Sequence, residues 1–309
     1  MKASLVWLLT MIAGFGAMLY SYYGMQTPQR EAIRSQAAAP KPPTGKSSHD
    51  NSTPRAKAIA SWTNPAMRVP SLAFHVYLGG MALFLLGGSG LFIRLFEYLS
   101  TVRRLRGFRL PMIETRRYRR LFIGAHLLCF GTALLFMELA FFAPETQREF
   151  MGMVSRVATH GRGLLRPAIA AYFAKDVLMA MLITVVNNFF LASVLTAMLP
   201  SLLVPGIGPL IMWLRFIFVG VLLSPTHVAL SSSMLPHSVT LLLEGEAYVM
   251  VCLFATLVPV YSFGKSEGPT FGRRYLRSII LNVKGSVWIL MLLVVAGAYE
   301  AVEVIAQIP

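Results

Sequence analysis

Residues 176–199 read DVLMAMLITVVNNFFLASVLTAML, and the aspartate at the first position is the only charged residue among them. A helix of about 20 mostly apolar residues is long enough to cross the hydrocarbon core of a bilayer, which is about 30 Å thick. This segment therefore predicts a membrane-spanning helix. It also carries two adjacent amides near its middle, Asn187 and Asn188, where polar groups are costly unless they find partners.

The same length criterion finds six more apolar runs along the chain. The composition agrees with a membrane protein, because 56% of the residues are hydrophobic and 13% are charged, whereas about 25% are charged in a soluble domain. We predict an all-α, polytopic membrane protein: a helical bundle of about seven transmembrane helices, or six if the first segment is cleaved. The additional runs are residues 5–22, 71–96, 121–142, 206–223, 238–261 and 279–299.

The first run and the segment that follows it differ in character from the rest. Residues 1–23 predict a signal anchor or first transmembrane helix, because the apolar stretch exceeds that of a cleaved signal peptide and no clear cleavage site precedes Gln26. Residues 24–70 are rich in Pro, Ser and Ala and have no apolar period, which predicts a disordered extracytoplasmic tether. Residues 71–309 are then a six-helix membrane domain.

The distribution of basic residues predicts how the chain is oriented. Short cytoplasmic loops carry an excess of Lys and Arg, and the loop after residues 71–96 contains eight arginines. A second basic loop, residues 265–277, has the same parity. We therefore predict a multi-pass protein of the cell inner membrane with a cytoplasmic N-terminus and an extracytoplasmic C-terminus. The eight arginines are Arg103, Arg104, Arg106, Arg109, Arg116, Arg117, Arg119 and Arg120.

An alternative topology keeps the tether inside by treating the first segment as peripheral. The net charge of +15 also raises the question of nucleic acid, since Phe108 and Tyr118 are interleaved with the arginines. Attraction to anionic cytoplasmic lipid explains the charge and the parity of both basic loops. We therefore expect the lipid bilayer, with anionic lipid at the basic loops, and no nucleic acid. A protein partner at the arginine loop is the alternative.

Three further ionisable residues deep in the predicted spans are the strongest leads. Arg215 lies about halfway along residues 206–223, and Glu244 and Glu246 lie about a third of the way into residues 238–261. With a rise of 1.5 Å per residue, Arg215 and Glu244 are each about 10 Å below the outer boundary. We hypothesise an ion pair between Arg215 and Glu244 or Glu246. The two glutamates are about 200° apart on a helix, so only one shares a face with Arg215.

These polar residues have two interpretations. Buried polar groups in membrane bundles often connect helices, with contributions of about 0.6–2 kcal/mol, and this packing role is the favoured interpretation. The alternative is that they line a transport pathway. Between the fourth and fifth runs, Pro205, Gly206 and Gly208 interrupt the chain, which predicts a tight turn at the inner surface, with a re-entrant element as the alternative.

No motif of catalysis or metal binding emerges. His237 and Glu244 are seven residues apart, about 10 Å along a helix, and there is no H-E-x-x-H or C-x-x-C pattern. Cys129 and Cys252 both lie in apolar runs, so no disulfide framework is indicated. Glycines at 79–80 and 87–90 predict close helix packing rather than a phosphate loop. We expect no metal, no cofactor and no enzymatic activity.

Residues 172–261 carry a series of short motifs in a fixed order: paired asparagines in one span, a glycine-rich break, a glycine in the next span, then Pro-His followed by Glu. This order resembles the stage II sporulation protein M family of integral membrane proteins. Three positions depart from the family pattern, since Val219 replaces Asn, Ser238 replaces Gly, and Glu244 follows His237 by seven residues rather than four. The motif residues are Phe173, Ala174, Asn187, Asn188, Ala192, Pro205, Gly206, Gly208, Phe218, Gly220, Leu235, Pro236, His237, Glu244 and Ala247.

The resemblance implies a non-enzymatic membrane scaffold or complex subunit. Family members in endospore formers look like scaffolds that recruit cell-wall hydrolases, so the expected partners are proteins that remodel the cell envelope, such as a cell-wall hydrolase, or a soluble ATPase complex. The alternative function is a membrane permease or transporter subunit in which Asn187, Asn188, Arg215 and Glu244 line a polar path near the midplane. An intramembrane hydrolase is a third, less favoured alternative.

Overall fold

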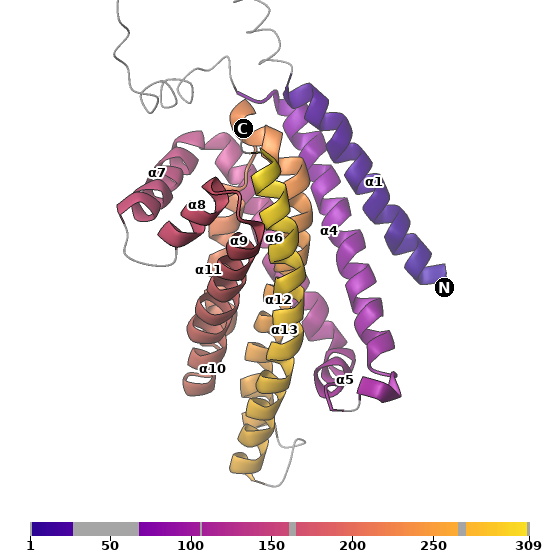
Figure 1. Ribbon diagram of the computed structural model, residues 1–309. Helices are drawn as coiled ribbons and strands as arrows, with labels where there is room; N and C mark the ends of the chain where they lie inside the picture. The colour runs from indigo at the N-terminus through magenta and orange to yellow at the C-terminus, as the bar shows by residue number, and fades with distance from the viewer. Residues whose placement is uncertain (1, 27–67, 106, 161–164, 265–269, 308–309) are drawn as a thin grey trace, which may run out of the picture.

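The computed structural model describes residues 2–26, 68–105, 107–160, 165–264 and 270–307, and it is helical almost throughout (Figure 1). Most of the predicted tether, residues 27–67, lies outside the described residues. The α-helices are α1 (Lys2–Met25), α4 (Ser71–Leu99), α5 (Leu110–Arg117), α6 (Arg119–Phe142), α7 (Pro144–His160), α8 (Leu165–Phe173), α9 (Val177–Val186), α10 (Leu199–Leu203), α11 (Ile207–Leu222), α12 (Val228–Phe263) and α13 (Phe271–Gln307), with a 3₁₀ turn η2 (Arg103–Leu105) and a π-helix η3 (Asn187–Met198).

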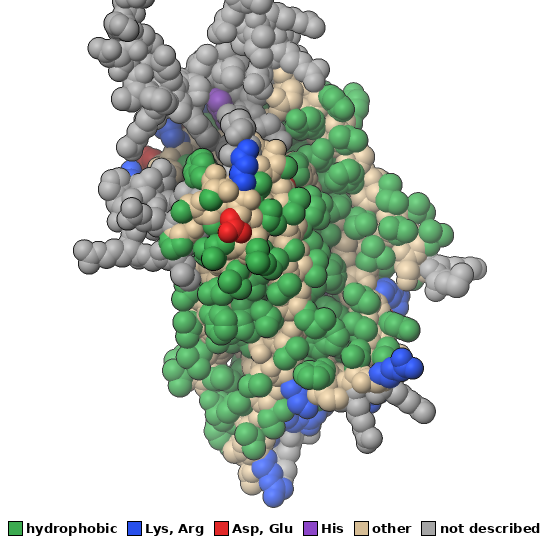
Figure 2. All heavy atoms as spheres, viewed as in Figure 1, with side chains coloured by type: hydrophobic (Ala, Val, Ile, Leu, Met, Phe, Trp, Pro, Cys, Tyr) green, Lys and Arg blue, Asp and Glu red, His purple; other side chains and the backbone are tan. Residues whose placement is uncertain are grey.

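The predicted polytopic membrane bundle is confirmed, because six helical spans among the described residues are long and apolar enough to cross a membrane. They match the predicted spans except that α11 is shorter than the rest. Its 16 residues extend about 24 Å, less than the bilayer core. Figure 2 shows that apolar side chains cover most of the visible lateral face of the bundle. The six spans are Ala3–Met25, Ser71–Leu99, Arg119–Phe142, Val177–Leu203, Ser233–Phe263 and Phe271–Gln307.

Helix α12 is the centre of the bundle. It packs against α13, α11, α6, α4, η3 and α1, and residues 247–255 are all buried. Within this stretch Tyr248 and Cys252 are the only residues with a polar side-chain atom, while the others are Ala, Val, Met, Leu and Phe. A helix that is apolar on every side is suited to complete burial. Polar side chains on α12 therefore point at neighbouring helices rather than at lipid.

Helix α1 packs against α4 along a line of glycines. A Cβ atom added to Gly14 would lie 2.5 Å from the Gly80 carbonyl oxygen, and one added to Gly87 would lie 2.7 Å from the Met11 Cα atom. Gly90 meets the Trp7 ring in the same way. Small residues allow two backbones to approach closely, which is how helices associate in lipid. The prediction that the glycines at 79–80 and 87–90 serve helix packing is confirmed for Gly80, Gly87, Gly88 and Gly90, whereas nothing lies within 4 Å of a Cβ atom at Gly79.

The two ends of the bundle carry different elements. The lower end in Figure 1 holds α5, the turn between α10 and α11, and the ends of α12 and α13. Helices α7 and α8 and the C-terminal end of α13 lie toward the opposite end. Basic side chains gather at the lower end in Figure 2. The two basic loops thus lie at the same end of the bundle, as the sequence predicts.

The arginine loop is more structured than its composition suggests. Arg103 and Arg104 lie in the 3₁₀ turn, Arg109 precedes α5, Arg116 and Arg117 end α5, and Arg119 and Arg120 begin α6, whereas Arg106 lies outside the described residues. Glu114 is buried and accepts a hydrogen bond of 3.1 Å from Arg277 Nη2, at the start of α13. This contact joins the two basic loops, because a carboxylate placed between them offsets part of their mutual repulsion.

The connection at residues 204–206 is a turn. Gly206 has φ of +98°, a left-handed conformation that side chains with a Cβ atom rarely adopt. Pro205 precedes it, and α11 begins at the next residue. A Cβ atom on Gly208 would lie 2.8 Å from both the Ala197 carbonyl oxygen and the Ala255 Cβ atom, so this glycine allows close approach of α11 to the preceding span and to α12. The predicted turn, rather than a re-entrant element, is what the structure contains.

Gly14 and Gly16 provide a matched test of the α1–α4 contact. Gly14→Leu is expected to destabilise the protein by about 1–3 kcal/mol, because the new side chain overlaps the backbone of α4. Gly16→Leu is expected to have little effect, because nothing lies within 4 Å of a Cβ atom at Gly16. Thermal unfolding of both variants in the same detergent measures the difference. Equal melting temperatures for the two variants would contradict the packing described above.

Candidate functional site

A cluster of polar side chains lies where η3, α11 and α12 meet. Asn188 Nδ2 donates to Glu244 Oε1 over 2.5 Å, and Asn188 Oδ1 accepts from Arg215 Nη2 over 3.5 Å. Arg215 Nη2 also donates to the Tyr248 hydroxyl over 2.6 Å, and its guanidinium lies 4.1 Å from the centre of the Tyr248 ring. The arginine is therefore held by an amide, a hydroxyl and an aromatic face, which together replace part of its lost hydration.

The predicted direct ion pair between Arg215 and Glu244 is wrong in its detail. Asn188 lies between the two side chains and binds both. An amide can do this because its oxygen accepts and its nitrogen donates. Glu246 does not face Arg215, in agreement with the expected 200° separation of the two glutamates, and its carboxylate contacts α4 and α6 instead.

The π-helix η3 begins at the paired asparagines. Ser193 Oγ donates to the Asn188 carbonyl oxygen over 2.8 Å, a bond that spans five residues as the wider helix does. Departures of this kind in α-helical segments are frequent at functional sites. Asn187 is half-buried, and its Nδ2 atom donates to Asn188 Oδ1 over 3.3 Å. Asn188 is thus the bridging residue of the pair, and Asn187 supports it.

The cluster continues from Glu244 to Glu300 on α13. The two carboxyl groups lie close to each other. Two neighbouring carboxylates repel each other in a buried site, and a proton on either one would relieve that repulsion. Tyr172 on α8 lies beside Glu300, and burial together with the nearby carboxylate raises the pKa of Tyr172 to about 12. Its hydroxyl group, which is 2.9 Å from Thr184 Oγ1, remains protonated near neutral pH.

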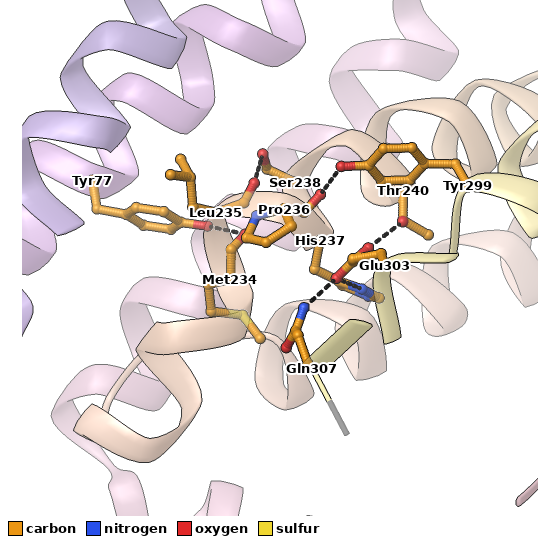
Figure 3. Close-up of polar contacts among 10 residues, drawn as sticks. All are labelled: Tyr77, Met234, Leu235, Pro236, His237, Ser238, Thr240, Tyr299, Glu303 and Gln307. Atoms are coloured by element: carbon orange, nitrogen blue, oxygen red, sulfur yellow. Dashed lines mark hydrogen bonds and ion pairs between the residues drawn. The ribbon is translucent and has the colours of Figure 1, made fainter. Parts of the chain in front are cut away.

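Toward the upper end, Glu303 gathers three side chains, as Figure 3 shows. Its carboxylate is 3.4 Å from His237 Nδ1, accepts from Thr240 Oγ1 over 2.9 Å, and accepts from Gln307 Nε2 over 3.3 Å. Beside it, the Tyr299 hydroxyl donates to the Pro236 carbonyl oxygen over 3.1 Å. A carbonyl oxygen has two lone pairs, so the Pro236 oxygen can accept this bond in addition to a helical bond from the backbone N–H of Thr240.

A pocket of about 180 Å³ adjoins this network between α11 and α12. His237, Thr240, Glu244 and Tyr248 line one side of it, and apolar residues of α11 such as Phe216 line the other. Glu244 is half-buried because it borders this pocket. The site therefore combines a carboxyl group, a histidine and a hydroxyl on one wall of a cavity. The cavity is large enough for a few water molecules.

A second buried cluster surrounds Glu246 on the opposite face of α12. Ser89 Oγ of α4 donates to Glu246 Oε1 over 2.7 Å, and His126 Nε2 of α6 is 2.9 Å from Glu246 Oε2. His126 Nδ1 is 2.7 Å from the Phe122 carbonyl oxygen, so Nδ1 carries a hydrogen. Nε2 and Glu246 then share one proton between them, which neutralises or pairs the buried carboxylate.

The remaining predicted motif residues position helices rather than polar groups. A Cβ atom on Gly220 would lie 2.8 Å from the Phe136 Cβ atom, so this glycine permits close contact between α11 and α6. Pro205, Gly206 and Gly208 belong to the turn at the lower end and are separate from the polar cluster. The cluster brings together Asn187, Asn188, Arg215, His237 and Glu244, while Glu246 belongs to the second cluster.

Sequence reasoning did not identify several members of these clusters. Glu300 and Glu303 fall beyond the predicted end of the last span at residue 299, whereas α13 continues to Gln307. His126 lies within a predicted span and was a detectable polar residue at membrane depth. Tyr248 and Ser89 carry no comparable signal, because isolated hydroxyl groups are common in membrane helices.

The first cluster contains three carboxyl groups, Glu244, Glu300 and Glu303, against the cations Arg215 and, when protonated, His237. This balance leaves room for at least one exchangeable proton. No group of three or more His, Cys, Asp or Glu side chains within the described ranges has a geometry that would hold a metal ion.

In comparisons with known proteins, no family model, no curated protein and no solved structure matches this chain.

The paired asparagines allow a direct test of the bridge. Asn188→Leu is expected to destabilise the protein by about 1–3 kcal/mol, because Arg215 and Glu244 each lose a partner in a buried site. Asn187→Leu, at the neighbouring position, is expected to cost less, about 0.5–1 kcal/mol, because it removes only the 3.3 Å hydrogen bond to Asn188 Oδ1. Detergent-to-SDS unfolding measures both. A bridge also requires Asn188→Leu and Glu244→Gln to be non-additive by more than about 0.5 kcal/mol, and additivity would contradict it.

Proposed function

We propose that the protein is a non-enzymatic membrane scaffold or complex subunit, similar in role to the stage II sporulation protein M family. The observation that carries this proposal is the length of its central helices. Helices α12 and α13 contain 36 and 37 residues and extend about 54–56 Å, nearly twice the thickness of the bilayer core. Ordered helix beyond the membrane offers a surface that other proteins can bind.

Further elements at the two ends support this proposal. Helix α5 packs against α13 at the lower end, where Trp288 Nε1 donates to the Phe108 carbonyl oxygen over 2.9 Å. At the opposite end, Gln147 of α7 is fully buried and its Nε2 atom donates to the Ser224 carbonyl oxygen over 2.6 Å. Both elements are thereby fixed to the bundle. A complex subunit benefits from such rigidity, because less conformational entropy is lost when a partner binds.

The polar clusters fit a scaffold as connections between helices. The first cluster joins η3, α11, α12 and α13, and the second joins α4, α6 and α12. Hydrogen bonds between membrane helices contribute about 0.6–2 kcal/mol each. Two clusters on opposite faces of α12 therefore hold most of the spans in one arrangement while both ends remain available to partners.

The proposed location is the inner membrane, with the basic lower end in the cytoplasm. In a variant whose two native cysteines are replaced by alanine, Arg148→Cys on α7 is expected to react with a membrane-impermeant maleimide in intact spheroplasts. Arg104→Cys is expected to react only after lysis. Both parent side chains are exposed, so access differs only by compartment. The opposite labelling pattern would reverse the orientation and move the expected partners to the other side.

The scaffold proposal predicts a stoichiometric partner. Purification from native membranes in mild detergent after crosslinking, followed by mass spectrometry, is expected to recover a cell-wall hydrolase if the outer end binds the partner, or a soluble ATPase if the inner end does. Arg148→Glu on α7 should release the first, and Arg104→Glu should release the second. Recovery of the chain alone under these conditions would contradict the proposal.

One observation favours a second function, that of a permease or transporter subunit. Glu244 and His237 line the 180 Å³ pocket, and Glu244 lies close to a second carboxyl group, Glu300. Protonatable carboxyl groups inside a membrane are typical of proton and cation pathways. Glu244→Gln separates the two functions. A permease should lose proton or cation flux in reconstituted vesicles with this change, whereas a scaffold should retain its partner and show no flux in either form.

A further inference from the structure

A second pocket lies on the lateral surface of the bundle between α1, α4 and α6. It has a volume of about 130 Å³, and its walls include Trp7, Leu86, Ile123 and Leu127. The Leu86 and Leu127 side chains are exposed, at 51% and 67%. In a membrane protein, exposed apolar side chains on a spanning helix face lipid hydrocarbon. The pocket therefore opens toward the acyl chains of the bilayer.

Two arginines line the same pocket. Arg94 Nη1 lies 2.9 Å from Glu97 Oε2, and Arg119 Nε lies 3.6 Å from Glu97 Oε1. Two positive charges thus share one carboxylate, which leaves an excess of one positive charge at this position. Each guanidinium has five N–H donors and Glu97 uses few of them. In the part of the chain that the structure describes, the buried Nε atom of Arg94 has no hydrogen-bond partner.

The depth of the two arginines matches the level of lipid headgroups. Arg94 follows Ser71, the first residue of α4, by 23 positions, or about 35 Å along the helix. A bilayer core is about 30 Å thick, so Arg94 lies near one boundary if Ser71 lies near the other. Arg119 begins α6 at the same end. Figure 2 shows basic side chains at this boundary, below the apolar lateral face.

We propose that this pocket binds one anionic phospholipid. The phosphate of the headgroup accepts hydrogen bonds from Arg94 and Arg119, and one acyl chain lies along the apolar walls beside Trp7. Charge complementarity and the opening toward hydrocarbon together identify the occupant, since a soluble anion would leave the apolar walls uncovered. The site differs from general attraction at the arginine loop, because Arg94 belongs to α4 and the binding is to one position. It does not depend on the scaffold proposal.

Trp7 makes the site measurable by fluorescence. A variant with Trp62, Trp213 and Trp288 replaced by phenylalanine retains Trp7 alone. In vesicles of unlabelled phosphatidylcholine, brominated phosphatidylglycerol is expected to quench Trp7 at a several-fold lower mole fraction than brominated phosphatidylcholine. Arg94→Gln and Arg119→Gln together should abolish this preference. Each single change should reduce it up to about fivefold, because a basic residue near the surface contributes about 1 kcal/mol to anionic-lipid binding.

Two controls separate this site from other effects. Arg148, on α7 at the opposite end of the bundle, is similarly exposed. Arg148→Gln should leave the preference for the anionic lipid unchanged. A variant that retains Trp288 instead of Trp7 reports on lipid near α13, and its quenching should not respond to the Arg94 and Arg119 changes. Arg94→Lys keeps the charge and should keep most of the preference. Loss of the preference in the double variant can then be assigned to the lost charge rather than to misfolding. Equal quenching by both lipids in the parent, or a preference that survives the double change, would overturn the proposal.

Discussion

The arrangement of this bundle depends on where two buried carboxyl groups on α12 find partners. Glu244 and Glu246 are two positions apart on the central helix, so they point to opposite sides of it. A carboxyl group deep in a bilayer is costly unless it has protein partners or faces a water-filled cavity. Asn188 and Glu300 meet Glu244, while His126 and Ser89 meet Glu246. The helices that carry these partners are thereby placed around α12.

Close packing at small residues also holds the helices together. Lipid tails are as apolar as a leucine side chain, so burial of apolar surface does little to bring membrane helices together. The close approach of helix backbones and the hydrogen bonds between helices are then the main sources of attraction. Gly14 lets α1 lie against α4, Gly208 lets α11 approach α12, and Gly220 lets α11 approach α6. Each close approach increases van der Waals contact, and the polar pairs then select one rotation of each helix over its alternatives.

The same polar network serves both functional proposals, and the difference between them lies in what the protons do. In a scaffold, a proton between the neighbouring carboxyl groups of Glu244 and Glu300 would stay in place and help to keep two helices together. In a pathway, it exchanges through the pocket that Glu244 and His237 line. The long α12 and α13 helices and the fixed elements α5 and α7 favour the first. The lateral Arg94–Arg119 pocket is independent of both, because it faces lipid.

The sequence by itself determined the fold class, the spans, the turn at Gly206 and the joint position of the basic loops, because span length and polarity are local properties that lipid constrains strongly. It also separated Glu244 from Glu246 through helical geometry. Only the tertiary structure decided that Asn188 bridges Arg215 to Glu244, that Glu300 and Glu303 belong to the site, and that His126 pairs with Glu246. Those contacts join residues 27 to 120 positions apart, and no local pattern specifies which faces of distant helices meet.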